Sequence, residues 1–279
     1  MKSKIRISSL FILLSLCLSF TVFAQQEKKL IILQTSDVHS RVEPINQEGD
    51  RNYDRGGYVR LATFMKDFRK NNPDVLLFDC GAFSQGTPYY NKFRGEVEVK
   101  MMNEMKYDAI TIGNHEFDNN LDNMDSLYLK ANFPIVCSNY DMSATILKDL
   151  VKPYVVIERA GVKIGVLGLG CKLEGMVQAD KCKGVVFKDP VATANEVAAI
   201  LKEKEGCDVV VCLSHLGVQE DEQVLIPKTR NIDVVLGGHT HTFMKGPKTL
   251  LNVDGKNVSL MHSYKSGICV GRMDLSLEN

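Results

Sequence analysis

The sequence predicts an α/β fold built as a single large domain. Short runs of β-branched and aliphatic residues alternate with amphipathic stretches of helical spacing along most of the chain, which is typical of sheets covered by helices. The 279 residues are 44% hydrophobic, enough to bury one sizeable core. No repeat or long linker divides the sequence. The 34 basic and 34 acidic residues cancel, so the charge gives no support for binding to nucleic acid or to an anionic membrane surface.

The first 24 residues differ in character from the rest. Three basic residues among the first six precede an apolar run over residues 10–23, and the small residue Ala24 ends it. These are the three parts of a cleavable signal peptide, and the run is too short for a comfortable membrane span. We therefore expect export to the periplasm or outside the cell, cleavage after Ala24 and a mature domain over residues 25–279.

A lipoprotein attached through Cys17 is the alternative for this segment. It is less favoured because Leu16 stands where a small residue normally precedes a lipidated cysteine.

In the first half of the chain, strands alternate with helices. Apolar residues recur at helical spacing after Gly56-Gly57, and Asn71-Asn72-Pro73 ends that helix. The next predicted helices are residues 96–105 and 121–131, and the predicted strands are residues 30–34, 75–78, 109–112 and 135–137.

The second half begins with a predicted hairpin, because two apolar runs are separated by Arg159-Ala160-Gly161. Pro190 then opens a helix that reaches about Lys204. The predicted strands of this half are residues 155–157, 162–169, 209–213, 234–236, 258–261 and 269–275.

Seven cysteines remain after the predicted cleavage, so they cannot all pair. Cys80, Cys137 and Cys212 lie in apolar runs and are predicted to be buried thiols. Cys171 and Cys182 flank a loop and could form a disulfide in an oxidising compartment. The sequence contains no Cys-x-x-Cys pair, so a structural zinc site has no support.

Five of the six histidines directly follow predicted strands, in short polar segments: His39, His115, His215, His239 and His241. The carboxyl ends of strands in α/β sheets converge on one crevice, and neutral imidazole is a favoured metal ligand. The histidines therefore predict a metal centre at that edge. The sixth, His262, lies in a strand-like run outside these segments, and we interpret it as structural.

The segments around these histidines carry a family resemblance. They are Asp37-Val38-His39-Ser40-Arg41, Asp79-Cys80-Gly81-Ala82, Gly113-Asn114-His115-Glu116-Phe117-Asp118, Ser214-His215 and Gly237-Gly238-His239-Thr240-His241. In this order they resemble the five blocks of the calcineurin-like metallophosphoesterase superfamily. Ser84-Gln85-Gly86-Thr87-Pro88 and Gly271-Arg272-Met273-Asp274 narrow the resemblance to the N-terminal catalytic domain of the 5′-nucleotidases. It implies a single-domain, four-layer α/β/β/α sandwich.

The resemblance also implies two divalent metal ions and hydrolysis of phosphomonoesters, nucleotides among them. Two metals can polarise a phosphoryl group and activate water, and mixed nitrogen and oxygen ligands suit zinc or manganese. The implied ligands are Asp37, His39 and His241 for the first metal, and Asn114, His215 and His239 for the second.

Further roles follow from the same resemblance. His115 is expected to act as the acid that faces the phosphate, and Asp118 to orient it, although Asp118 also suits the start of a helix. Arg41 and Asn114 are expected to contact substrate, since a guanidinium matches phosphate oxygens. For Arg41 the alternative is a solvated loop residue.

The chain departs from the family in two ways. Ala82 stands where an aspartate normally bridges both metals, and Asp79 could replace it only if the turn were rebuilt. We also expect the family's second, base-binding domain to be absent. The sequence therefore leaves two alternatives open beside the enzyme: a degenerate metal- or phosphate-binding module, and a catalytic subunit that requires a separately encoded substrate-binding domain.

Overall fold

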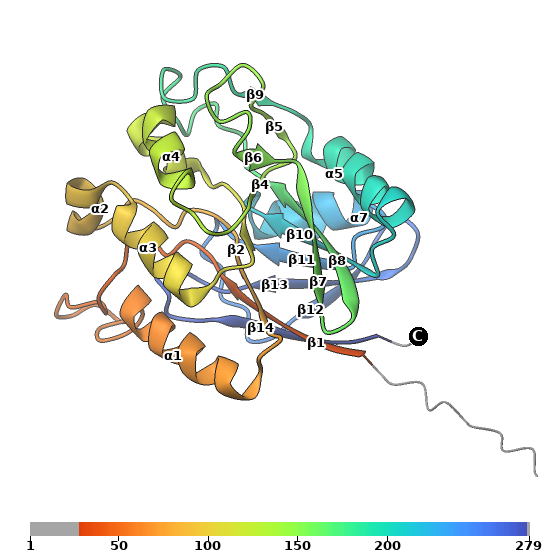
Figure 1. Cartoon of the computed structure of the whole chain (residues 1–279), viewed down its shortest axis with the longest axis horizontal. Helices are drawn as coiled ribbons and strands as arrows, with labels where there is room; N and C mark the ends of the chain where they lie inside the picture. Colours follow the sequence, from red (N-terminus) through yellow and green to blue (C-terminus); the bar gives the residue numbers. More distant parts are fainter. Residues whose placement is uncertain (1–27, 278–279) are drawn as a thin grey trace, which may run out of the picture.

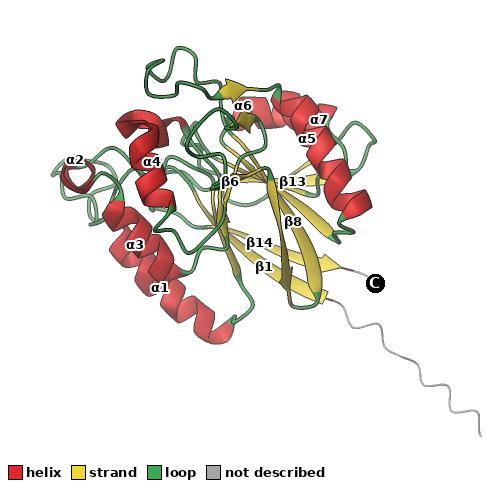
Figure 2. Ribbon diagram, turned by 45° about the horizontal axis from the view of Figure 1, so that its top comes forward, coloured by secondary structure: helices red, strands yellow, loops and turns green. Residues whose placement is uncertain are grey.

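The computed structural model describes residues 28–277, so the predicted signal peptide and its cleavage site lie outside the described residues. Two six-stranded sheets face each other, and helices cover the outer face of each sheet (Figures 1 and 2). The four-layer α/β/β/α sandwich predicted from the sequence is thereby confirmed. Within residues 28–277, no helix combines the length and the apolar character that a membrane crossing requires.

The first sheet is mainly parallel and has the strand order β14-β1-β2-β3-β4-β6. Its members are β1 (Lys28–Thr35), β2 (Leu76–Asp79), β3 (Ala109–Ile110), β4 (Ile135–Val136), β6 (Val151–Lys152) and β14 (Gly271–Leu277). β1 pairs in parallel with β2, with Ile32 opposite Leu76, and antiparallel with β14. The last strand of the chain therefore lies beside the first (Figure 1).

The second sheet has the order β12-β13-β11-β10-β8-β7. Its members are β7 (Tyr154–Arg159), β8 (Val162–Leu169), β10 (Val209–Ser214), β11 (Val234–Gly237), β12 (Lys248–Leu251) and β13 (Asn257–His262). The central strands β8, β10, β11 and β13 run parallel, and the hairpin β7–β8 and strand β12 close the two edges. A separate small ribbon pairs β5 (Tyr140–Asp141) with β9 (Val186–Phe187).

The helices divide between the two outer faces. They are α1 (Tyr58–Asn71), α2 (Pro88–Phe93), α3 (Glu96–Met105), α4 (Asn120–Tyr128), α5 (Pro190–Ala199), α6 (Val218–Glu220) and α7 (Ile226–Lys228). A 3-10 helix (Asn114–Asn119) precedes α4, and π-helical turns (Ile200–Lys204 and Asp221–Leu225) follow α5 and α6. Helices α1 to α4 lie on the side of the first sheet, and α5 and α7 on the side of the second (Figure 1).

The core consists of three apolar layers. Leu30 and Phe78 from the first sheet and Val211 from the second belong to the layer between the sheets. A second layer joins the first sheet to α1, α3 and α4, and a third joins the second sheet to α5 and α7. Because β2, β10 and β11 are covered on both faces, every residue in them is buried.

The predicted elements are confirmed with small shifts. The last strand begins at Gly271 rather than residue 269, and the helix predicted over 121–131 ends at Tyr128. The sequence pattern did not predict β12, an edge strand whose residues are mostly exposed and so lack an apolar alternation. The proposed disulfide is wrong, since Cys171 and Cys182 are free thiols.

Candidate metal centre

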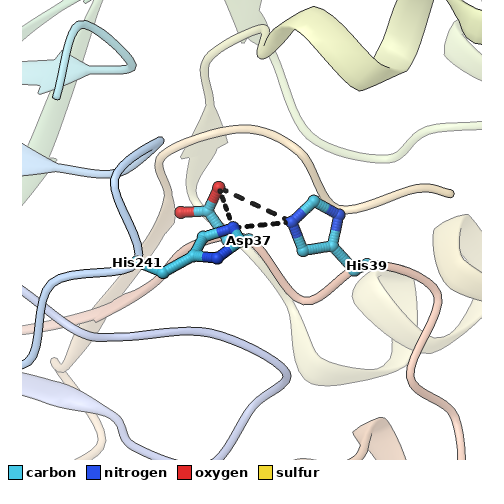
Figure 3. A group of neighbouring side chains, drawn as sticks. All are labelled: Asp37, His39 and His241. Atoms are coloured by element: carbon cyan, nitrogen blue, oxygen red, sulfur yellow. Dashed lines mark hydrogen bonds and ion pairs between the residues drawn. The ribbon is translucent and has the colours of Figure 1, made fainter. Parts of the chain in front are cut away.

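The site is built around Asp37, which follows β1 at the carboxyl edge of the first sheet. Its Oδ1 atom lies 3.6 Å from Nε2 of His241 and 3.9 Å from Nε2 of His39. The two Nε2 atoms are 2.9 Å apart. Figure 3 shows the three side chains pointing toward one another. A carboxylate and two imidazoles on separate loops thus present their ligand atoms to one point, a group able to hold a metal ion.

The Asp37 carboxylate is fixed by the loops around it. Oδ2 accepts hydrogen bonds from the Ser36 hydroxyl and, at 3.0 Å, from the backbone N–H of His239. The backbone carbonyl of Asp37 accepts from the N–H of Ser266 at 2.8 Å. Burial would raise the pKa of Asp37, but the nearby imidazoles of His241 and His215 outweigh this effect and lower the pKa to about 2. The carboxylate is therefore charged at neutral pH.

His215 follows β10 and is completely buried. Its Nδ1 donates to the backbone carbonyl of Cys80 at 2.6 Å, and its Nε2 has no hydrogen-bond partner. This Nε2 lies 4.0 Å from Oδ1 of Asp37, and the ring is 5.0 Å from that of His239. Because Nδ1 is committed to the Cys80 carbonyl, Nε2 is the ring atom left to face the site.

Two histidines of the site favour the neutral form. Burial lowers the pKa of His39 and of His239 to about 4, against the opposing effect of Asp37. Neutral imidazole is the form that binds metals. The rings are therefore ready to act as ligands at neutral pH.

The loops that carry the site adopt unusual backbone conformations. Six non-glycine residues here have φ between 50° and 73°, namely Asp37, His39, Ser40, Ala82, His239 and His241. Left-handed conformations are uncommon outside glycine and concentrate at functional sites, where surrounding structure over-determines them. The backbone is thus shaped to aim these side chains inward.

His115 and Asp118 form the pair that the family resemblance implied. Nδ1 of His115 donates to Oδ2 of Asp118 at 2.8 Å, and this hydrogen bond raises the pKa of His115. The His115 ring lies 5.2 Å from that of His39, edge to face. Asp118 does not cap α4, where Oδ1 of Asn120 instead accepts from the N–H of Asn123 at 3.2 Å. The neighbouring Asn114 is buried, and its Oδ1 lies 3.9 Å from the Cys171 thiol.

Arg41 and Asp79 are two other residues that the sequence suggested for the site. Arg41 is partly buried and its Nε has no partner among residues 28–277. Asp79 is fully buried, where its carboxylate accepts hydrogen bonds from Thr35 Oγ1 at 2.6 Å and from the N–H of Gly81 at 2.9 Å. Asp79 is therefore held by its own strand and turn and does not take the place of the missing bridging carboxylate.

Glu116 is a residue whose role sequence reasoning missed. Its Oε2 accepts from the N–H groups of Ala82 at 2.8 Å and Gly113 at 2.7 Å, and its Oε1 accepts from Ser84 Oγ at 3.2 Å. It thereby ties the loop containing Ala82 to the loop containing Asn114. The position of Glu116 is the signal that could have identified this role. A glutamate three residues after the residue that precedes a helix is the acidic half of a capping box.

His262 is buried behind the site. Its Nε2 pairs with Oδ2 of Asp221 at 2.9 Å, while Oδ1 of Asp221 accepts from Ser214 Oγ at 2.5 Å. A Cβ on Gly237 would lie 2.1 Å from His262 Nε2, so this glycine leaves room for the pair. The contacts support the structural role predicted for His262.

The fold and the site define a class of protein. The chain belongs to the calcineurin-like phosphoesterase family, whose model matches residues 30–243.

The chain is also similar to 5′-nucleotidases. The chain is 32% identical to a snake venom 5′-nucleotidase of Crotalus adamanteus over 271 residues, which cover 90% of this chain and 46% of the relative. It is 30% identical to a 5′-nucleotidase of Homo sapiens over 271 residues, covering 90% of this chain and 47% of that protein. The chain thus spans about half the length of the curated relatives it matches.

Solved structures agree with this placement. A 5′-nucleotidase precursor from Thermus thermophilus superimposes with a TM-score of 0.81 at 28% identity, covering 90% of this chain and 52% of that one. A calcineurin-like phosphoesterase from Bacillus subtilis has a TM-score of 0.75 at 28% identity, covering 91% of this chain and 86% of that one.

Proposed function

We propose that this protein is a metal-dependent phosphomonoester hydrolase of the 5′-nucleotidase kind. The observation that carries the proposal is the convergence of the Nε2 atoms of His39, His215 and His241 on one oxygen of Asp37, within 4.0 Å in each case. Membership of a phosphoesterase family supports the reaction class. When bound, divalent metals would activate water and neutralise charge on the phosphoryl oxygens.

The residues present fit a metal. Two nitrogens bound to one tetrahedral zinc at about 2.0–2.1 Å lie about 3.3–3.4 Å apart. The facing Nε2 atoms of His39 and His241 are 2.9 Å apart, about 0.5 Å short of that spacing. The orphaned Nε2 of His215 likewise points to a ligand. We assign Asp37, His39 and His241 to one metal, and Asn114, His215 and His239 to the other. The mixed nitrogen and oxygen donors suit zinc or manganese.

Protein groups would supply the proton and orient the ester. His115, held by Asp118, would protonate the leaving oxygen, and the hydrogen bond to Asp118 raises the pKa of His115, which favours its protonated form. Arg41 would contact the phosphate oxygens through its guanidinium. Asn114 would contact substrate beside its metal, because its amide also carries N–H donors.

The substrates we propose are phosphomonoesters, with nucleotides favoured by the names of the relatives. The partner that we propose is a separately encoded domain that helps to bind substrate, and the greater length of those relatives is consistent with it. The N-terminal segment supports export, so we place the protein in the periplasm or outside the cell.

A direct test measures metal content and hydrolysis together. The mature protein, purified without chelator, should contain about two metals per chain and hydrolyse 4-nitrophenyl phosphate and AMP. Chelation should abolish the rate, and manganese or zinc should restore it. A protein with both metals bound but no rate on either ester would contradict the proposal.

Ala82 favours a second candidate, a binding module with little turnover. Its side chain is buried at the site and offers neither charge nor donor atom. A metal content of one or less, with measurable binding of inorganic phosphate but no hydrolysis, would support this candidate over the enzyme.

A further inference from the structure

A pocket lies beside the proposed metal centre. It encloses about 430 Å³ and is lined chiefly by Arg51, Arg55, Phe243, Tyr264 and Cys269. That volume falls within the range of small-molecule sites, about 300–1,000 Å³. The metal ligands assigned above and the His115–Asp118 pair do not contribute to its walls.

The walls of this pocket are joined to the metal loops. Phe243 follows His241 by two residues, so their Cα atoms are at most about 7 Å apart. The N–H of Tyr264 donates to the carbonyl of Thr242 at 3.0 Å. The segment after β13 is in turn tied to Asp37 through the N–H of Ser266 at 2.8 Å. The pocket therefore lies within reach of a small molecule that has one end at the metal centre.

The pocket is positively charged. Among residues 28–277, neither Arg51 nor Arg55 forms an ion pair with a carboxylate, whereas Arg60 pairs with Asp54 at 2.7 Å. Arg51 Nη2 instead donates to the Tyr264 hydroxyl at 2.8 Å, and no acidic residue lines the pocket. The guanidinium groups keep donors free for a ligand that carries oxygen or nitrogen acceptors.

The pocket also offers an aromatic face. The Phe243 side chain is 60% exposed, and its backbone is held by a bridge to Ser263. Planar ligands stack on such rings and on guanidinium planes. An exposed ring next to free arginine donors matches a flat heteroaromatic group with acceptor atoms better than an alkyl chain.

We propose that this pocket binds the planar, acceptor-bearing leaving group of the phosphoester, with the nucleobase of a nucleoside monophosphate as its chemical class. The inference rests on the proposed function and deepens it. The family resemblance placed base recognition on a second domain, whereas the pocket would locate part of it on the catalytic domain itself.

The test compares one planar and one aliphatic ester. We would measure kcat/KM for AMP and for glycerol 2-phosphate in the wild type, in Phe243→Ala and in the control Tyr53→Ala. Tyr53 is an exposed aromatic residue of the same loop as Arg51 but does not line the pocket. Loss of one stacked base should lower the AMP to glycerol phosphate ratio about 5- to 150-fold in Phe243→Ala. Tyr53→Ala should keep the wild-type ratio.

A ratio that stays within twofold of wild type in Phe243→Ala, or an equal fall in Tyr53→Ala, would overturn the proposal. Adenosine binding, monitored by saturation-transfer NMR, provides a readout that needs neither metal nor turnover. Wild type should bind adenosine, and Phe243→Ala should lose that binding. If the wild type hydrolyses neither ester, the proposed function fails, but adenosine binding still tests the pocket. Absence of adenosine binding in the wild type would overturn the pocket proposal.

Discussion

Replacing Ala82 by aspartate should strengthen metal binding and weaken the metal-free protein. The backbone at Ala82 suits the change, because its φ is 56° and aspartate is among the residues enriched in the left-handed region. Its N–H is held by Glu116 at 2.8 Å, so the loop is already anchored. Of the six assigned ligands, only Asp37 brings a charge, against four positive charges on two divalent metals.

The size of the effect can be estimated. Supporting groups around a metal are worth about 10–100-fold in affinity, which corresponds to about 1.4–2.7 kcal/mol. At about 2–4 °C per kcal/mol for a domain of this size, metal-saturated Ala82→Asp should melt about 3–10 °C above wild type. Without metal, the new carboxylate is buried near Glu116 and Asp37 with no compensating charge. The Tm of metal-free Ala82→Asp should therefore fall below that of the metal-free wild type.

The assay is a thermal melt with and without chelator, alongside metal stoichiometry and kcat/KM at fixed metal concentration. Ala82→Asn is the matched control, since it has the same shape and adds no charge. We expect Ala82→Asp to reverse the sign of its Tm change between the two conditions, and Ala82→Asn to show at most a small gain. If metal content, Tm and rate in Ala82→Asp are unchanged or lower with metal present, the site is organised around alanine and the binding module becomes the better hypothesis.

Four other predictions address separate parts of the protein. His115→Ala should keep its metals and lose about 10²–10⁴-fold in kcat, whereas His215→Ala should lose metal by elemental analysis; equal metal loss in both would refute the distinction. Glu116→Gln should lower the urea-derived unfolding free energy by about 1.5–3 kcal/mol, because one carboxylate serves several donors across two loops. Burial raises the pKa of Glu98 above 4.5, so the protonated form stabilises the fold at low pH and this stability is lost as pH rises. Glu98→Gln should therefore raise Tm at pH 8 and leave it nearly unchanged at pH 4, and a gain of equal size at both would exclude this cause. Intact-mass measurement of exported protein should show cleavage after Ala24, and a lipid-modified N-terminus would contradict it.

Much of the fold could be predicted from local pattern. The run Val209–Ser214 is apolar almost throughout and forms a strand that is buried on both faces. Glycine and proline mark helix boundaries: α1 begins after Gly57, where φ is 90°, and α5 begins at Pro190. These signals are local because backbone preference and hydrophobic period act over a few residues. The same holds for the site segments, since each polar cluster directly follows its own strand.

The sequence by itself therefore determined the α/β class, the order of the elements and the histidine-rich segments that must meet at the carboxyl edge. Only the tertiary structure decided which atoms face one another there. Contacts such as His39 with His241, 202 residues apart, depend on strand order and register, which sequence spacing does not encode. The tertiary structure also decided how Asp79 is held, how Glu116 ties two loops together and where the pocket beside Phe243 forms. These arrangements depend on side chains and backbone groups from several loops that meet only after the two sheets have packed.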